Sequence, residues 1–238
     1  AARLGSADAH WCAVLDAVVV NLERMGFSET VGGVLGLDAL SSFDLDFDFP
    51  RSVVRVYMAG AVERGLLDTA GLEGVACGVL PGGKLGIKME LNGGGFFTGV
   101  LDVGSNSSAG NWAAARDLDV TTLVAGEASS YPRETGRSRP LFKAHFDTVQ
   151  LGHVLLASET AEAEAADALE GRLHVYIGHL PEFDTLSADV AGKNDQSRQL
   201  AMVGLDLLGD SRLVLSCKSK KLFFKPKEIN DVWAGQVI

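Results

Sequence analysis

The stretch FTGVLDVGSNSSAGNW, residues 97 to 112, decides the fold of this chain. An apolar, strand-like run ends at Asp102, and a glycine follows with a string of small hydroxyl and amide residues. A carboxylate between Leu101 and Val103 is costly to bury, so either backbone donors satisfy it or it takes part in chemistry. Asp102 is therefore the first candidate functional residue.

The residues on either side of Asp102 predict a β-hairpin and a helix. KLGIKMEL at 84–91 alternates as a strand, NGGG at 92–95 supplies a turn, and FFTGVLDVG at 96–104 returns as a second strand. NWAAARDLDV predicts a short helix with Asn111 near its N-cap.

An internal repeat is the second informative feature. VLGLDALSSFDLDFDFPRSVVRVYM at 34–58 aligns without gaps with MVGLDLLGDSRLVLSCKSKKLFFKP at 202–226. Each copy predicts a short helix followed by two alternating strands joined by a turn. Asp38 and Asp206 occupy matched positions, which predicts a shared structural role such as capping the helix or bonding a loop backbone.

Only the second copy has a hairpin before it, and this difference predicts the domain organisation. We expect a mainly β, mostly antiparallel chain with short helices. We also expect one further strand before each copy of the repeat. The helices are expected at about 37–42, 111–117 and 205–209, and the preceding strands at 17–22 and 172–180. The predicted divisions are 1–58 as the closing half of a first unit, 59–83 as a connector rich in Gly and Pro, 84–226 as a complete unit, and 227–238 as a C-terminal tail.

The order of the N-G hairpin, LDVGS, the NWAAA helix and MVGLDLL resembles a retropepsin-like aspartic peptidase domain over roughly 84–226. The resemblance implies a closed or partly closed antiparallel β-barrel. It implies that Asp102 is the catalytic aspartate, that Gly104 allows a tight loop, and that the Ser105 hydroxyl bonds the outer carboxylate oxygen. Gly204 would close the far side of the loop. In that family two aspartates, from two lobes or subunits, share a proton and hold the water that attacks the scissile carbonyl.

The chain departs from the family pattern in two ways. Val103 stands where the family has Thr or Ser, and the chain holds one such aspartate instead of two. We therefore expect a catalytically impaired relative that acts as a scaffold, a peptide-binding module or a subunit of a larger assembly. The alternative is an active aspartic endopeptidase that pairs Asp102 with a second Asp from a dimer partner or an upstream segment. A lone Asp102 braced by backbone donors would titrate with an ordinary or lowered pKa.

Two other aspartates mimic the catalytic motif. Asp68 in LLDTAG has alanine where the tight glycine is needed, and Asp147 in HFDTVQLG has no following glycine. We interpret both as non-catalytic.

Composition narrows the remaining classes of function. The net charge of −10 argues against nucleic acid as a partner, and no apolar run is long enough to span a bilayer. Three widely spaced cysteines and five histidines without ligand spacing indicate neither a disulfide framework nor a metal site, and glycine-rich stretches lack nucleotide-binding motifs. We expect no cofactor, a protein or extended peptide as partner, and an intracellular reducing compartment. The start of the chain at Ala1 suggests removal of an upstream segment, as for a chloroplast or mitochondrial protein.

Overall fold

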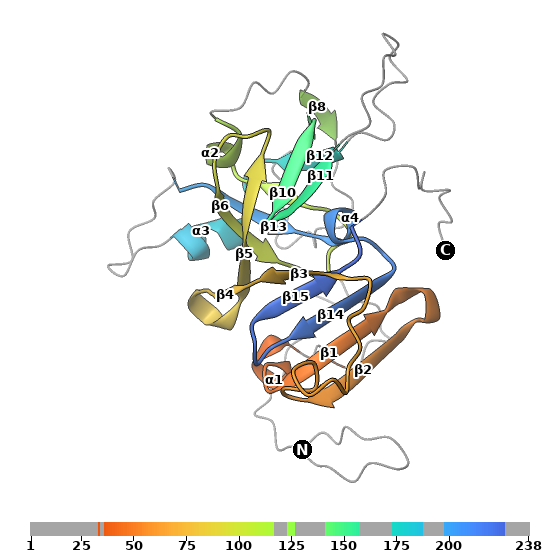
Figure 1. The fold of residues 1–238 in the computed structure, drawn as a ribbon. Helices are drawn as coiled ribbons and strands as arrows, with labels where there is room; N and C mark the ends of the chain where they lie inside the picture. The colour runs from red at the N-terminus through yellow and green to blue at the C-terminus, as the bar shows by residue number, and fades with distance from the viewer. Residues whose placement is uncertain are drawn as a thin grey trace.

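The computed structural model describes residues 33, 36–116, 123–126, 141–157, 173–187 and 198–226. These residues form one sheet of five strands and one of ten, with few short helices (Figure 1). The predicted mainly β, mostly antiparallel fold is confirmed. Two predictions lie outside the described residues: the strand at 17–22 and the tail at 227–238.

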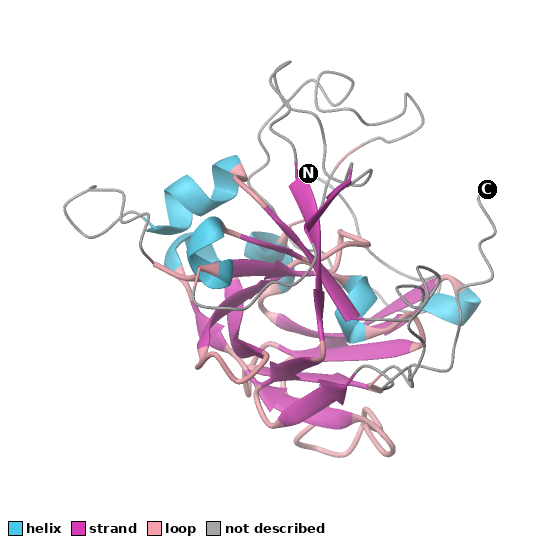
Figure 2. Ribbon diagram, turned by 90° about the horizontal axis from the view of Figure 1, so that it is seen from above, coloured by secondary structure: helices cyan, strands magenta, loops and turns pink. Residues whose placement is uncertain are grey.

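The ten-stranded sheet curls into a partly closed barrel (Figure 2). Its order is β11-β10-β5-β6-β13-β7-β12-β9-β8, and β4 also pairs with β5. Neighbouring strands are antiparallel except for two parallel pairs, β6 with β13 and β7 with β12. The strands are β4 (Gly78–Val79), β5 (Leu85–Leu91), β6 (Phe97–Leu101), β7 (Ala109–Gly110), β8 (Leu123–Gly126), β9 (Leu141–Phe146), β10 (Thr148–Leu151), β11 (Val154–Ala157), β12 (Leu173–Ile177) and β13 (Leu200–Val203).

The predicted hairpin before Asp102 is confirmed. β5 and β6 pair antiparallel, with Met89 opposite Phe97. The turn places Asn92 and Gly93 at φ +45° and +72°, the left-handed conformation that an N-G turn needs. The tight turn fixes the register that carries β6 toward Asp102.

The five-stranded sheet has the order β2-β1-β14-β15-β3. Its strands are β1 (Phe43–Asp48), β2 (Val53–Met58), β3 (Glu73–Ala76), β14 (Arg212–Ser216) and β15 (Lys221–Phe224). The α-helices are α1 (Leu37–Leu40), α2 (Trp112–Ala115), α3 (Pro181–Ser187) and α4 (Leu205–Leu208), and short 3-10 helices cover Phe49–Arg51 and Pro81–Gly83. The helices expected near 37–42, 111–117 and 205–209 are therefore present, whereas α3 was not predicted.

The two hairpins of the five-stranded sheet have the same register. Leu45 lies opposite Val56 in the first hairpin, and Leu213 lies opposite Phe224 at the matching positions of the second. The preceding helices, α1 and α4, also begin and end at matched residues. β1 pairs antiparallel with β14, so the two hairpins lie side by side in one sheet.

Residues 59–83 are more regular than the predicted connector. β3 pairs with β15 and closes one edge of the five-stranded sheet, and β4 pairs with β5 in the other sheet. The chain therefore crosses directly from one sheet to the other within this segment. The sequence pattern missed β3 because its partner lies far along the chain.

The main hydrophobic core lies between the two sheets. Leu45, Leu213 and Phe224 of the five-stranded sheet share it with buried side chains of the ten-stranded sheet, such as Met89. Burial of this shared apolar surface holds the two sheets together. Among the described residues, no helix is long and apolar enough to cross a membrane.

Candidate functional site

Asp102 lies at the start of a loop that crosses the end of a strand. The loop, residues 102–108, connects β6 to β7, and β13 lies between these two strands. The Asp102 amide donates to the Val203 carbonyl at 3.0 Å, which extends the pairing of β6 with β13 up to the loop. The sheet topology therefore fixes where the carboxylate stands.

The Asp102 side chain is half-buried and accepts one backbone hydrogen bond. The side-chain Oδ1 accepts a hydrogen bond from the Gly104 amide at 3.2 Å. The main-chain carbonyl of Asp102 accepts one from the Ser105 amide at 3.1 Å. Burial raises the pKa of Asp102; the Gly104 amide and the Lys84 charge oppose this shift, and the Glu182 charge adds to it. The expectation of an ordinary or lowered pKa is wrong, because burial outweighs the single backbone donor.

The Ser105 hydroxyl stabilises the loop itself. Its Oγ donates to the Ser107 carbonyl at 2.8 Å and accepts from the Ser107 amide at 3.2 Å. A hydroxyl has one proton to donate, so it cannot donate to Asp102 at the same time. The expectation that Ser105 bonds the outer oxygen of Asp102 is therefore wrong in this structure.

The two residues between Asp102 and Ser105 have ordinary surroundings. Gly104 does not have a positive φ, and a Cβ there would lie 3.4 Å from Asp102 Oδ1, an ordinary contact. The loop therefore does not require glycine at this position, contrary to the expectation. The Val103 side chain packs against the main core. It has no hydroxyl with which to brace a second loop.

Gly204 lies directly beneath the loop, against the Ser105 and Ser107 backbone. A Cβ at this position would come within 2.8 Å of the Ser107 carbonyl carbon and oxygen and 2.9 Å of the Ser105 carbonyl oxygen. Its φ is −96°, which any residue adopts, so the requirement for glycine is one of space. The neighbouring Leu205 amide donates to the Ser105 carbonyl at 2.9 Å and joins the loop to α4.

A clamp between Ser108 and Asp206 holds the end of the loop. The Ser108 amide donates to Asp206 Oδ2 at 2.8 Å, and the Ser108 hydroxyl donates to Oδ1 at 2.5 Å. The same hydroxyl accepts from the Gly204 amide at 2.9 Å. Burial raises the pKa of Asp206, and the hydrogen bonds from Ser108 oppose the shift. Asp206 thus bonds a loop backbone, as its position in the repeat predicted.

Sequence reasoning missed Ser108. Its side chain is fully buried and satisfies both the Gly204 amide and the Asp206 carboxylate. Three serines lie between Gly104 and Ala109, and nothing in the local pattern distinguishes this one. The prediction that Asp206 bonds a loop backbone was the signal that could have directed attention to it.

The matching position in the first unit has a different environment. Gly36 corresponds to Gly204 and begins α1 in the same way, because the Leu40 amide bonds the Gly36 carbonyl as the Leu208 amide bonds that of Gly204. Gly36 is exposed, however, whereas Gly204 is buried beneath the loop. Within the described ranges, no loop covers the start of α1 in the way that 102–108 covers α4.

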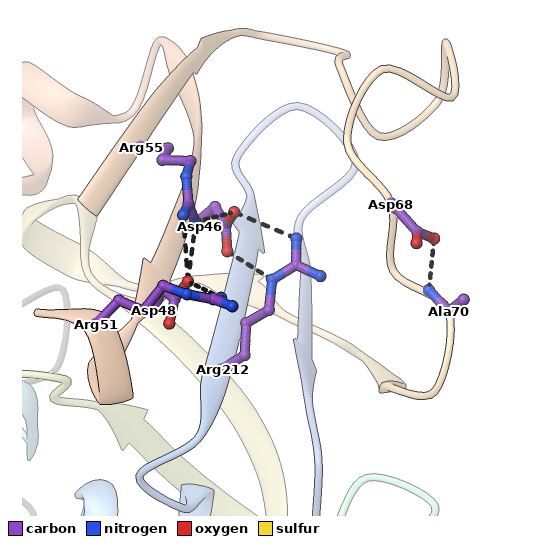
Figure 3. A network of polar contacts seen from close by, with 7 residues as sticks. All are labelled: Asp46, Asp48, Arg51, Arg55, Asp68, Ala70 and Arg212. Atoms are coloured by element: carbon purple, nitrogen blue, oxygen red, sulfur yellow. Dashed lines mark hydrogen bonds and ion pairs between the residues drawn. The ribbon is translucent and has the colours of Figure 1, made fainter. Parts of the chain in front are cut away.

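The other aspartates that mimic the motif lie in turns. Asp68 is exposed and its Oδ1 accepts from the Ala70 amide at 2.9 Å (Figure 3). Asp147 is exposed at the bend between β9 and β10, where its amide donates to Asn92. Neither belongs to the loop over β13. Among the described residues, no group of three or more His, Cys, Asp or Glu side chains could hold a metal ion.

A separate network of charges joins β1, β2 and β14 on the face of the five-stranded sheet opposite to Leu45 (Figure 3). Asp46, almost fully buried, accepts from Arg212 Nε at 2.8 Å and from Arg55 at 3.2 Å. Asp48 accepts from Arg51 at 2.9 Å, and this bond lowers the pKa of Asp48. Each carboxylate is already paired with arginine, and the bonds from Arg212 to Asp46 join the second hairpin to the first.

No protein-family model and no curated protein matches the chain. Among solved structures, the chain is similar to a retropepsin-like aspartic protease from Rickettsia conorii. The likeness has a TM-score of 0.37 and 14% sequence identity, and it covers 64% of this chain and 91% of that one. At this level of similarity, no residue role is transferred from that protein.

Proposed function

We propose that this chain is an aspartic-peptidase-like protein that carries one carboxylate loop, does not cleave peptides by itself, and serves as a peptide-binding module or as a subunit of a larger assembly. The observation that carries the proposal is the contrast between two matched glycines. Gly204 is buried beneath the Asp102 loop, whereas Gly36 is exposed. The second carboxylate loop that the chemistry requires has no counterpart among the described residues.

The chemistry explains why one carboxylate is insufficient. Hydrolysis by paired carboxylates needs one ionised group to take a proton from water and one protonated group to polarise the carbonyl. Asp102 is half-buried with a raised pKa, so it is suited to one of these roles. Glu182 contributes only through its charge, and Val103 offers no hydrogen bond to brace a second loop.

A second candidate function is an active aspartic endopeptidase that recruits another aspartate loop. The open start of α1 favours it, because α1 has the same length and the same first hydrogen bonds as α4. A loop like 102–108, from another copy or from an upstream segment, would then seat on Gly36. The proposed division into a closing half at 1–58 and a complete unit at 84–226 agrees with the shared hairpin register.

The remaining features of the proposal concern partners and environment. The reaction class uses water and two carboxylates and requires no cofactor. An extended peptide or another protein is the proposed partner. The proposed environment is a reducing intracellular compartment, in which the cysteines would stay as thiols.

Peptide hydrolysis tests the proposal directly. The chain and its Asp102→Asn variant are assayed on an unfolded protein between about pH 3 and 7, the range spanned by free and paired carboxylates. We expect no cleavage that depends on Asp102. Turnover that Asp102→Asn abolishes would establish the second candidate, and a rate that rises with the square of protein concentration would identify dimerisation as its cause. Val103→Thr is the companion variant: activity that appears only in it would identify the missing hydroxyl as the defect.

A further inference from the structure

The strand β2 leaves one edge of the five-stranded sheet open. β2 pairs with β1 on one side, and among the described residues no strand pairs with it on the other. Three valines and a methionine of this strand are exposed: Val53, Val54, Val56 and Met58. An apolar edge strand with free peptide groups is a template for pairing with another strand.

The opposite edge of the same sheet shows what such an edge binds. β15 is the strand that matches β2 in the repeat, and it is covered by β3, with Leu222 opposite Val75. Because the two hairpins share one register, Val54 corresponds to Leu222 and Val56 to Phe224. Within the described part of the chain, the five-stranded sheet therefore contains both a covered and an uncovered form of one edge.

Burial differs sharply between the matched positions. Val54 is 57% exposed and Val56 is 39% exposed, whereas Leu222 and Phe224 are both 0% exposed. Val56 lies opposite the buried Leu45, so these two valines are on the core side of the sheet. Their side chains point to the same face as the main core, but no strand of the described residues lies beside them.

The peptide groups of the open edge point outward. The Cys77 amide donates a hydrogen bond to the Lys220 carbonyl. Since peptide groups alternate in direction along a strand, those of Leu222 and Phe224 also point toward β3. By the shared register, Val54 and Val56 direct theirs away from β1. Arg64 agrees with this direction, because its Nη2 donates to the Met58 carbonyl at 3.4 Å from outside the hairpin.

We propose that the open edge of β2 binds one antiparallel strand of an extended polypeptide, in the register that β3 adopts on β15, with an apolar residue opposite Val54. The occupant resembles β3. It is a short extended segment whose central residues are uncharged and whose side chains alternate between the two faces of the sheet. Its main chain exchanges hydrogen bonds with Val54 and Val56. Main-chain bonds supply the affinity, and the apolar residue opposite Val54 supplies the selection. The inference is independent of Asp102 and holds whether or not the chain hydrolyses peptides.

A peptide with the sequence of residues 70–79, carrying Cys77→Ser, is the probe, because it contains β3 itself. Binding to the whole chain is measured by fluorescence anisotropy, and the site is located by amide hydrogen exchange. We expect weak saturable binding, with a Kd of about 10–500 μM, and slower exchange at the amides of Val54 and Val56. Exchange at Leu222 stays unchanged, because its amide is already bonded to the native β3.

Two substitutions at one position separate main-chain pairing from apolar contact. Val54→Pro removes an amide that faces the open edge, and proline is tolerated there because that amide bonds no strand of the sheet. We expect it to weaken binding at least about tenfold, whereas Val54→Thr keeps the amide and the branched shape and changes binding less than about threefold. The unfolding midpoint of each variant shows that the fold is retained.

Each remaining outcome overturns the proposal. It fails if the probe shows no binding at about 1 mM, if Val54→Pro binds as well as the original chain, or if the protected amides are those of β15. It also fails if the free chain forms a dimer that already protects Val54 and Val56, since a second copy would then occupy the edge. Peptide hydrolysis by the Asp102 loop is measured separately and affects none of these results.

Discussion

Substitution of Gly204 by alanine tests the way in which the Asp102 loop is held. The added methyl group would lie within 2.8–2.9 Å of three atoms of the Ser105 and Ser107 backbone, and backbone cannot rotate away as a side chain can. The loop must shift. The strain of this overpacking costs roughly 1–3 kcal/mol of stability, and weakening of the hydrogen bond from the Leu205 amide to the Ser105 carbonyl costs about 1 kcal/mol. We expect the free energy of unfolding to fall by about 2–4 kcal/mol.

Gly104→Ala is the matched control, because it adds the same methyl group to the same loop in open surroundings. Its Cβ would lie 3.4 Å from Asp102 Oδ1, so we expect a change below about 0.5 kcal/mol. Both variants are compared by urea unfolding with the slope of the transition held in common. Equal stabilities of the two variants would refute the claim that close backbone packing, and not a special backbone angle, accounts for the glycine at 204.

Three further predictions concern buried polar groups. Because the pKa of Asp206 is raised in the folded chain, its contribution to stability is complete below pH 3.8, the ordinary pKa of aspartate, and is lost as pH rises through the folded pKa. The free energy of unfolding should therefore fall above about pH 4, and Asp206→Asn should flatten this fall. Parallel curves of unfolding free energy against pH for the two proteins would contradict the prediction. Asp46→Ala leaves two arginines without their shared acceptor and should cost roughly 1–3 kcal/mol by urea unfolding, while a neutral result would show that the network is not stabilising. Burial raises the pKa of Cys77 and Cys217 to about 11, so in a Cys12→Ser background alkylation at pH 8 should be roughly a hundredfold slower than for an exposed thiol, and a rate typical of free cysteine would refute their burial.

The sequence predicted those features that depend on short-range pattern. The N-G turn determined the hairpin of β5 and β6, since Asn92 and Gly93 tolerate the left-handed conformation that the turn needs. The helix beginning after Asn111 was predicted from its cap, and the Asn111 side chain does accept from the Ala114 amide. In both cases a few adjacent residues contain the whole physical cause.

Features that depend on distant partners were predicted poorly. The Ser105 hydroxyl can rotate to any nearby acceptor, and the fold of the loop presents the Ser107 carbonyl in place of the Asp102 carboxylate. β3 is only four residues long, so its alternation is too short to be recognised in the sequence. It forms a strand because it pairs with β15, which lies far along the chain. The burial of Asp46 was also not predicted, since it depends on two arginines from neighbouring strands.

The predicted repeat was informative because it allows matched positions of two hairpins to be compared within one chain. The matched positions of Asp38 and Asp206 directed attention to a structural role, which the clamp with Ser108 shows for Asp206. The site itself was predicted only in part: Asp102 and Gly204 lie together around one loop, whereas the reasons given for Gly104 and Ser105 were wrong. The family resemblance indicated which residues form the loop. It did not indicate their hydrogen-bond partners, because those depend on how the loop packs.

The titration of Asp102 tests the central claim, that it stands as a lone carboxylate, most directly. The carboxyl carbon signal of Asp102, assigned by its loss in Asp102→Asn, is followed by NMR as pH is varied. The structure predicts a single transition with a pKa above the ordinary value of 3.8, because burial raises it and no second aspartate of the described residues shares its proton. A titration in two separated steps, as a coupled pair of carboxylates produces, would contradict the account and show that a second aspartate faces Asp102.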